Sequence, residues 1–200
     1  DRSVSRGLGD VYKRQIEEIF LFYKKTAQYK KIDYNFCSEV EGRNIFCDPN
    51  YLELITNNLL SNAFKYTGEG KSITIILKEE NTTLLLQVKD TGSGIPNDKQ
   101  RRIFERFYQV DNEHLGSGIG LSIVQRLVDL HHGKIELESQ EGIGSTFSIF
   151  LPTDESVYKT EEKATGQETE AHATNSQDIY ITDTAVSYTH LRAHETLSDL

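Results

Sequence analysis

The chain has 200 residues, with 22 Lys and Arg against 31 Asp and Glu, and its formal net charge is −9. This acidic balance argues against a nucleic-acid-binding surface, because phosphate contacts need clustered Lys and Arg. No apolar run approaches the roughly 20 residues of a membrane-spanning helix, and the start lacks the apolar core of a secretory signal. The two cysteines lack metal-ligand spacing, so we expect a reduced, cytosolic setting.

The N-terminal part of the chain predicts one helix and two strands. Residues 1–14 show no hydrophobic period, and we expect them to be a non-native or disordered leader outside the fold. The first predicted helix covers residues 15–31, where apolar residues keep to one helical face. Alternating apolar and polar residues then predict a half-buried strand over 32–37, with a shorter partner strand over 44–47.

A second helix is predicted to begin at Asp48 and Pro49, an N-cap acid before a proline at the first helical position. It would end near Gly68, and its inner face would carry Leu52, Ile55, Leu59 and Ala63. Residues 71–78 and 83–89 predict the two strands of a hairpin that leads directly into a glycine-containing loop.

The second half of the chain begins with a predicted helix around residues 97–108. Polar residues without an apolar period follow over 109–115 and suggest a mobile lid. The glycine-rich stretch 116–120 then begins another predicted helix, which carries an apolar stripe and would end near Gly133.

A second predicted hairpin, with strands over 134–139 and 145–151, completes the compact part of the chain. The order of elements predicts an α+β fold, a two-layer sandwich in which helices cover one face of a mixed sheet. Beyond it the composition turns acidic and polar, which is typical of disorder. We therefore expect four segments: a leader at 1–14, a catalytic domain at 15–152, an acidic disordered linker at 153–184 and a non-native tail at 185–200.

One loop carries an isolated carboxylate where a strand stops. It runs Asp90-Thr91-Gly92-Ser93-Gly94-Ile95-Pro96. Two glycines let the backbone approach a flat ligand closely while the acid points into the pocket. The same pattern also fits an ordinary turn, so the loop alone does not decide between the two.

Two asparagines lie four residues apart on the second helix. Asn58 and Asn62 would project their amides from one face, with Lys65 and Tyr66 on the next turn. Asparagine is unfavourable inside a helix, so this stripe needs a reason. The amides either are solvated or cap local backbone, or they hold a hydrated Mg²⁺ between triphosphate oxygens. The residues alone favour the first alternative.

The glycines at 116, 118 and 120 precede a helix, where backbone N–H groups can approach a phosphate. No strand precedes them, which argues against a dinucleotide-binding unit, and no Walker A ending is present. Between the two glycine loops, Phe104 and Phe107 lie three residues apart, which fits a core-facing aromatic helix.

These stretches occur in one order with compatible spacing. Together they resemble the asparagine, first glycine, phenylalanine and second glycine boxes of the sensor histidine kinase catalytic domain, at residues 58–66, 90–96, 103–107 and 116–124. Residues 144–147 (GSTF) are similar to that domain's closing strand. The resemblance covers about residues 16–152 and implies the Bergerat ATP-binding fold, shared with type II topoisomerases, mismatch-repair ATPases and a class of heat-shock chaperones.

The resemblance implies an adenine site around Asp90. This carboxylate would accept a hydrogen bond from the exocyclic amine, with Thr146 nearby and Tyr66 flanking the base. The other ATP-contacting residues of this loop would be Gly92, Gly94 and Ile95.

The resemblance also implies a phosphate and metal site. Asn62 would ligate Mg²⁺ with help from Asn58, Lys65 would contact phosphate oxygens, and Arg106 would meet the γ-phosphate. Asn58, Lys65 and Arg106 are therefore the candidate catalytic residues. The backbone that would cradle the phosphates belongs to Gly116, Ser117, Gly118, Ile119, Gly120 and Leu121.

The implied activity is that of a protein histidine kinase, which transfers the γ-phosphate of ATP to a histidine on a dimerisation domain missing here. ATP-hydrolysing relatives generally place a glutamate at the position of Asn58, and an amide cannot act as that base. The alternatives are an ATP-sensing pseudokinase and a related Bergerat-fold ATPase or serine kinase. His131 and His132 are expected to be surface residues, and His194 is not expected to be an acceptor.

The implied partners are the histidine-containing dimerisation domain of the parent kinase and the receiver domain of a response regulator. No nucleic acid is expected. We expect this fragment to be monomeric, unable to autophosphorylate alone and cytoplasmic, with a dimeric parent either free or anchored in the inner membrane.

Overall fold

A computed structural model of the chain describes residues 6–40, 44–110 and 117–157. Within these ranges the helices are α1 (Gly9–Tyr29), α2 (Pro49–Tyr66) and α3 (Gly120–Leu130), with a short 3-10 turn at Glu155–Val157. The strands are β1 (Arg6–Leu8), β2 (Asp33–Glu39), β3 (Asn44–Phe46), β4 (Ser72–Glu80), β5 (Thr83–Asp90), β6 (Lys134–Gln140) and β7 (Gly144–Pro152).

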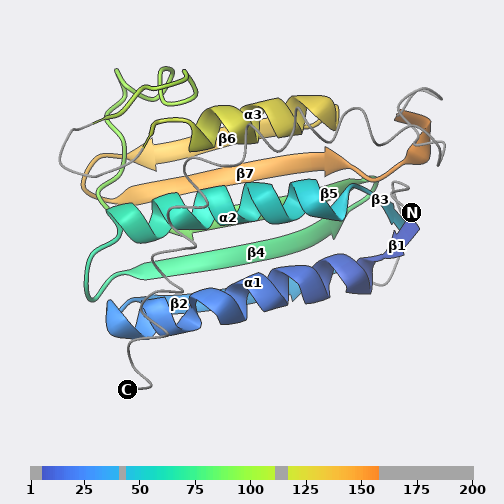
Figure 1. Ribbon diagram of the computed structural model, residues 1–200, viewed down its shortest axis with the longest axis horizontal. Coiled ribbons are helices and arrows are strands. Elements are labelled where there is room, and N and C mark those ends of the chain that lie inside the picture. Colours follow the sequence, from blue (N-terminus) through green and yellow to red (C-terminus); the bar gives the residue numbers. More distant parts are fainter. Residues whose placement is uncertain (1–5, 41–43, 111–116, 158–200) are drawn as a thin grey trace.

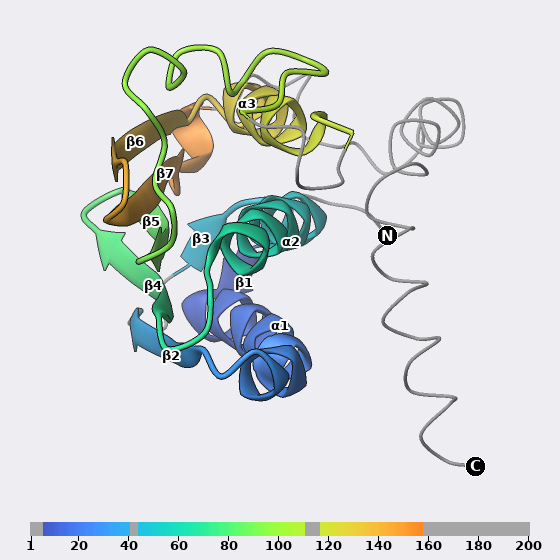
Figure 2. The same cartoon turned by 90° about the vertical axis from the view of Figure 1, so that its left-hand side faces the viewer.

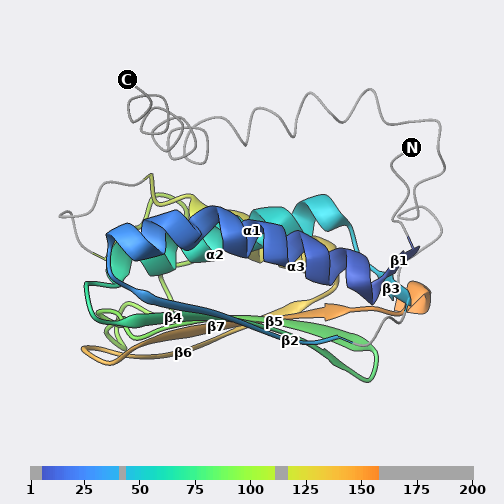
Figure 3. The ribbon, with the colours of Figure 1, turned by 90° about the horizontal axis from the view of Figure 1, so that it is seen from below.

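Five of these strands form one mixed sheet in the order β2-β4-β5-β7-β6. Strands β2 and β4 are parallel, and the remaining neighbours are antiparallel. The three helices form a layer over one face of this sheet (Figures 1 and 3). The predicted α+β sandwich is therefore confirmed.

Helix α2 begins and ends as its sequence predicts. The Asp48 carboxylate accepts a hydrogen bond from the Asn50 N–H at 2.8 Å, and Pro49 is the first helical residue. At the other end the Thr67 N–H donates to the Ala63 carbonyl at 2.9 Å. Its predicted inner-face residues, Leu52, Ile55, Leu59 and Ala63, are all buried.

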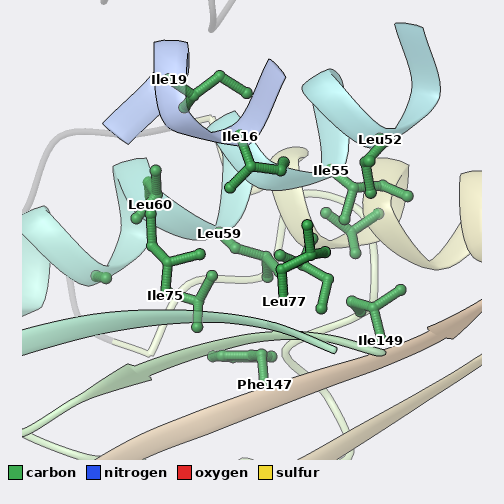
Figure 4. Close-up of a cluster of buried hydrophobic side chains, with 14 of the residues drawn as sticks. Ile16, Ile19, Leu52, Ile55, Leu59, Leu60, Ile75, Leu77, Phe147 and Ile149 are labelled. Carbon is green, nitrogen blue, oxygen red and sulfur yellow. The ribbon is translucent and has the colours of Figure 1, made fainter. Parts of the chain in front are cut away.

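The hydrophobic core lies between the helical layer and the sheet (Figure 4). Helices α1 and α2 contribute Ile16, Ile19, Leu52, Ile55, Leu59 and Leu60, and the sheet contributes Ile75, Leu77, Phe147 and Ile149. Burying each such side chain stabilises the fold by about 1.5–3 kcal/mol. This packing holds α2 above the sheet and so sets where its polar stripe lies.

Strand β3 pairs differently from the prediction. It was expected to pair with the strand before it, whereas it pairs with β1, and β2 instead pairs in parallel with β4. A parallel pair requires a long crossover connection, and α2 supplies it. Tyr34 and Phe36 of β2 face the helices, where the Phe20 ring of α1 lies 4.6 and 5.9 Å from theirs.

The N-terminal part of the fold starts earlier than expected. Helix α1 begins at Gly9 rather than at residue 15. The Tyr12 side chain is fully buried, and its hydroxyl donates to the Cys47 carbonyl at 2.7 Å. The expectation that residues 1–14 lie outside the fold is therefore wrong for 6–14, because a buried tyrosine and the pairing of β1 attach them to it.

The predicted helix around residues 97–108 is a succession of turns. Its backbone hydrogen bonds are of the i to i−3 kind, as from the Arg102 N–H to the Lys99 carbonyl at 2.9 Å. Side chains bond nearby carbonyls instead, because Gln100 Nε2 donates to Ile95 O and Lys99 Nζ to Val110 O, each at 2.9 Å. These local bonds compete with the helical pattern.

His131 is buried, with only 4% of its surface exposed, which corrects the expectation of a surface residue. Its Nε2 accepts a hydrogen bond from the Asp48 N–H at 3.2 Å, and its ring lies 5.0 Å from that of Tyr51. Burial lowers the pKa of His131 below its usual 6.5. His132 beside it is exposed, as expected.

Candidate functional site

Asp90 ends β5 in a buried position, with 8% of its surface exposed. Its Oδ1 accepts a hydrogen bond from the Gly92 N–H at 2.8 Å. Burial raises the pKa of Asp90 above its usual range, although the N–H groups of Gly92 and Ser145 and the charge of Lys71 act in the opposite direction. A buried carboxylate with a perturbed pKa is a candidate ligand-binding group.

The loop after Asp90 packs closely against the end of α2. A Cβ at Gly92 would lie 2.4 Å from the Tyr66 carbonyl oxygen and 2.7 Å from Asp90 Oδ1, so only glycine fits there. The Ser93 N–H donates to the same Tyr66 carbonyl at 3.1 Å. Lys71, which sequence reasoning missed, donates from Nζ to the Gly92 carbonyl at 2.9 Å.

The far side of this loop rests on the end of β6. Gly94 has a φ of +66°, and a Cβ there would lie 1.9 Å from the Gln140 carbonyl oxygen. The Ile95 N–H donates to Ser139 Oγ at 2.8 Å. The two glycines therefore allow the loop to approach the backbone of the chain itself, at Tyr66 and Gln140, and their approach to a flat ligand stays a prediction.

Ser145, rather than Thr146, lies beside Asp90. In the β5–β7 register Asp90 faces Ser145, while Lys89 faces Thr146. Successive side chains of a strand point to opposite faces, so Thr146 lies on the face away from the helices. Ser145 is 6% exposed on the same face as the buried Phe147. This alternation, already present in the sequence, was the signal that could have identified Ser145.

The asparagine stripe of α2 faces the start of α3. Asn58 Nδ2 donates to the Leu54 carbonyl at 2.8 Å, which fixes the amide, and its Oδ1 would lie 2.8 Å from a Cβ built on Gly120. Asn58 is only 9% exposed, so it is not solvated, but its bond to the Leu54 carbonyl is the local backbone contact that the first alternative describes. Asn62 is half-buried one turn later, at the spacing that places it on the same helical face.

The next turn of α2 carries Lys65 and Tyr66, both half-buried. The Lys65 ammonium lies 5.1 Å from the centroid of the Tyr66 ring. Because the Tyr66 carbonyl contacts the loop after Asp90, this turn joins the asparagine stripe to the carboxylate.

The second glycine loop forms the start of α3. Gly118 has a φ of +69°, and a Cβ there would lie 2.8 Å from the Tyr108 carbonyl oxygen. The Gly118 carbonyl accepts from the Phe107 N–H at 2.9 Å. Helix α3 has no side-chain cap at Ile119, so its first N–H groups form a site suited to an anion. Residue 116 and the lid residues 111–115 lie outside the described ranges.

The segment between the two glycine loops is only partly buried. Ile103 is 5% exposed and Phe104 packs against the core, but Phe107 is 74% exposed with a φ of +65°, so the expected core-facing pair is wrong for Phe107. Arg106 is exposed and precedes the residue that bonds Gly118. Arg102 lies over the Tyr108 ring at 4.3 Å.

A buried carboxylate, a stripe of amides and an uncapped helix start therefore meet at one end of the sheet. Among the residues that the structure describes, no group of three or more His, Cys, Asp and Glu could hold a metal ion. Within the same ranges, no helix is long and apolar enough to cross a membrane.

Residues 47–155 match the family described as histidine kinase-, DNA gyrase B-, and HSP90-like ATPase. The chain belongs to this family. The chain is 35% identical over 144 residues to Histidine kinase P4 of Formosa agariphila, and this match covers 68% of the chain and 10% of that protein. It is 36% identical over 139 residues to the adaptive-response sensory kinase SasA of Prochlorococcus marinus, and this match covers 68% of the chain and 36% of that protein. The chain thus spans a minor part of these relatives.

Solved structures of histidine kinases have the same fold as this chain. The catalytic domain of histidine kinase ThkA aligns with a TM-score of 0.63 at 28% identity, covering 70% of this chain and 91% of that one. Full-length ShkA in complex with AMPPNP aligns with a TM-score of 0.65 at 27% identity, and the alignment covers 72% of this chain and 30% of that one. The chain is therefore a kinase domain homologous to the catalytic domains of sensor histidine kinases.

Proposed function

We propose that this domain binds Mg-ATP and transfers the γ-phosphate to a histidine on the dimerisation domain of a sensor histidine kinase. One observation carries the proposal. The buried Asp90 carboxylate and the uncapped start of α3 come from distant parts of the sequence, and α2 contacts both: its last turn bonds the loop after Asp90, and its Asn58 faces Gly120. Each supplies a group that a different part of a nucleoside triphosphate needs.

The base would bind beside Asp90. The carboxylate accepts a hydrogen bond from the exocyclic amine of adenine, while Gly92 and Gly94 let the loop pack against Tyr66 and Gln140 and so hold it beside the base. Ser145 takes the neighbouring position that the resemblance assigned to Thr146. Tyr66, at the end of α2, flanks the base.

The phosphates would bind at the start of α3. The backbone N–H groups from Ser117 to Leu121 would bind them, with the Ile119 N–H exchanging its bond to Ser117 Oγ for one to phosphate, and Lys65 would supply a positive charge. Asn58 Oδ1 already faces this helix start, and an amide oxygen is a suitable ligand for a hard cation, so Asn62 and Asn58 fit Mg²⁺. When bound, Mg²⁺ neutralises phosphate charge, and Arg106 is the candidate for the γ-phosphate.

The amide at Asn58 favours transfer over hydrolysis. A general base must accept a proton, and an amide side chain does not do so near neutral pH. Phosphoryl transfer depends mainly on positioning and on charge neutralisation, which the residues of this site can supply.

The proposed partners follow from the activity. A histidine on a dimerisation domain would receive the phosphate, and the receiver domain of a response regulator would accept it next. Among the structural neighbours, ThkA is seen in complex with the response regulator protein TrrA at a TM-score of 0.60. We further propose a monomeric, cytoplasmic domain whose parent is dimeric.

Binding of a fluorescent ATP analogue to the chain, with and without Mg²⁺, tests the nucleotide site. Replacing Asp90→Asn should weaken binding by roughly 10- to 150-fold, since a charge-assisted hydrogen bond contributes about 1.5–3 kcal/mol. Asp98→Asn, at an exposed position near the same loop, is the matched control and should bind like the wild type. Folded wild-type protein that fails to bind would refute the proposal.

A separately purified histidine-containing hairpin tests the transfer step. Incubation with labelled Mg-ATP and this domain should give an acid-labile phosphohistidine on the hairpin. An acid-stable product would indicate a serine kinase, and binding without transfer would indicate an ATP-sensing module.

A further inference from the structure

Lys71 contacts the loop after Asp90 from outside every motif named above. It immediately precedes β4, and its carbonyl accepts from the Asp33 N–H at 2.9 Å, so its backbone is tied to the start of β2. From there its half-buried side chain donates from Nζ to the Gly92 carbonyl at 2.9 Å. The sheet therefore holds an ammonium group against the loop that would bind the base.

This ammonium fixes one peptide unit of the loop. The Gly92–Ser93 peptide is held on both sides, because its carbonyl accepts from Lys71 and its N–H donates to the Tyr66 carbonyl at 3.1 Å. The N–H just before it, that of Gly92, donates to Asp90 Oδ1 at 2.8 Å. Since glycine permits many backbone conformations, losing the Lys71 bond would free this peptide to rotate and would disturb the N–H that orients the carboxylate.

The charge of Lys71 also acts on Asp90. Burial favours the neutral carboxyl group, whereas the nearby ammonium favours the ionised form. The side chains opposite Asp90 in the register, Ile73 of β4 and Ser145 of β7, carry no charge. On α2, Lys65 lies over the ring of the residue that follows it. Lys71 therefore supplies the positive charge that stabilises ionised Asp90.

The charge state of Asp90 determines which purine its site accepts. An ionised carboxylate can only accept hydrogen bonds, whereas a neutral carboxyl group can also donate one. Adenine presents an amine donor at its 6-position, and hypoxanthine presents a carbonyl acceptor at the same position. Ionised Asp90 therefore pairs with a 6-amino purine and repels a 6-oxo purine, and neutral Asp90 loses this discrimination.

We propose that Lys71 is a positioning residue for base selection, whose ammonium holds the Gly92–Ser93 peptide and maintains Asp90 as a pure hydrogen-bond acceptor for a 6-amino purine. The inference rests on the proposed ATP site. Lys71 acts through Gly92 and Asp90 rather than by contact with the nucleotide.

Affinities of the full chain for Mg-ATP and for Mg-ITP, its 6-oxo counterpart, test this role when they are measured between pH 5.5 and 8. Lys71→Met keeps the aliphatic stem and should weaken ATP binding about 3- to 10-fold at pH 7, the range of a single hydrogen bond. The preference for ATP over ITP should decline at a higher pH in this variant, because neutral Asp90 then forms at a higher pH. Lys71→Arg keeps a charged donor and should restore both the affinity and the pH profile.

Lys89→Met is the matched control. It removes the same charge, but Lys89 is exposed and lies opposite Thr146, on the face of the sheet away from the helices. It should leave the binding of both nucleotides unchanged. Asp90→Asn removes the titrating group, so its ratio of ATP to ITP affinity should not depend on pH, with or without Lys71→Met. Inorganic tripolyphosphate lacks a base and should bind equally to every variant.

Two outcomes would overturn the role of Lys71 while leaving the ATP site intact. One is wild-type affinity with an unchanged pH profile in a folded Lys71→Met variant. The other is an equal loss of ATP and ITP affinity at every pH, which would show a purely structural effect on the loop. Failure of the folded wild-type chain to bind ATP would instead refute the proposed function and the inference together.

Discussion

At the scale of single residues, the site contains a carboxylate that is costly to bury. Asp90 has a raised pKa because burial outweighs the N–H donors of Gly92 and Ser145 and the charge of Lys71. The folded chain therefore holds the Asp90 proton more tightly than the unfolded chain does. Ionised Asp90 consequently destabilises the nucleotide-free fold near neutral pH, and the bound ligand would add a further hydrogen-bond donor to the carboxylate.

Asp90→Asn should therefore raise the melting temperature of the nucleotide-free chain at pH 7, even though it weakens ATP binding. Asn can still accept from the Gly92 N–H but carries no charge to desolvate. The gain should shrink as the pH falls toward 3.8, the ordinary pKa, because wild-type Asp90 then becomes neutral as well. Melting curves at pH 7 and 4.5 check this. An equal or lower melting temperature at pH 7 would contradict it, and Asp98→Asn is the control.

His131 predicts the opposite dependence on pH. Its folded-state pKa lies below 6.5, so the unfolded chain takes up the proton first as the pH falls. The free energy of unfolding should decrease below about pH 6.5, by at most about 1.4 kcal/mol per pH unit for this one group. Protonation would also remove the acceptor for the Asp48 N–H at the start of α2.

Urea unfolding between pH 7.5 and 5 measures this dependence. His131→Gln should flatten the curve, whereas His132→Gln, at an exposed position, should leave the slope as it is. An unchanged slope in His131→Gln would show that another group causes the pH dependence.

At the scale of elements, the pairing of β1 with β3 and the first turns of α1 close one end of the helical layer. Tyr12 is the central contact, because its ring is fully buried and its hydroxyl bonds Cys47. This element supports the start of α2, the helix that carries the asparagine stripe.

Tyr12→Ala should lower the free energy of unfolding by about 3–5 kcal/mol, as for other large aromatic residues removed from a core. Tyr12→Phe removes only the hydroxyl and should cost about 1 kcal/mol. Val11→Ala is the control, since Val11 is 51% exposed and should change little. Denaturant unfolding distinguishes the three, and a neutral Tyr12→Ala would place residues 6–14 outside the stable fold after all.

At the scale of the whole molecule, the nucleotide site lies where both layers meet. The end of β5, the last turns of α2 and the start of α3 lie at the same end of the sandwich (Figure 2). Distant segments of the chain therefore have to be folded before the site exists. Ligand binding should in turn stabilise the whole fold.

Mg-ATP at about 100 times its Kd should stabilise the chain by roughly 2.7 kcal/mol, which corresponds to an increase in melting temperature of roughly 5–11 °C. A chelator that removes Mg²⁺ should abolish most of this increase. Thermal melts with ATP, with ATP plus EDTA, and with Asp90→Asn measure it. An increase that persists in EDTA would argue against the Asn62 metal site.

Local chemistry in the sequence determined much of the fold and of the candidate site. The Asp48 cap, the amphipathic faces of the helices, both hairpins and the glycines of the Asp90 loop follow from propensity and periodicity, which act over a few residues. The family resemblance was likewise carried by short motifs. The roles of individual site residues, and the linker and tail beyond residue 157, remain predictions.

Only the tertiary structure decided which distant segments meet. The strand register places Ser145 instead of Thr146 beside Asp90. Strand β2 pairs in parallel with β4, and β3 pairs with β1. Tertiary packing buries Tyr12 and His131. Each depends on contacts between residues far apart in the chain. Alternation along a strand indicates that Ser145 shares a face with Phe147, but only the register shows that Ser145 is the residue opposite Asp90. The physical reason is that propensity acts along the backbone, whereas burial and strand pairing are properties of the assembled layers.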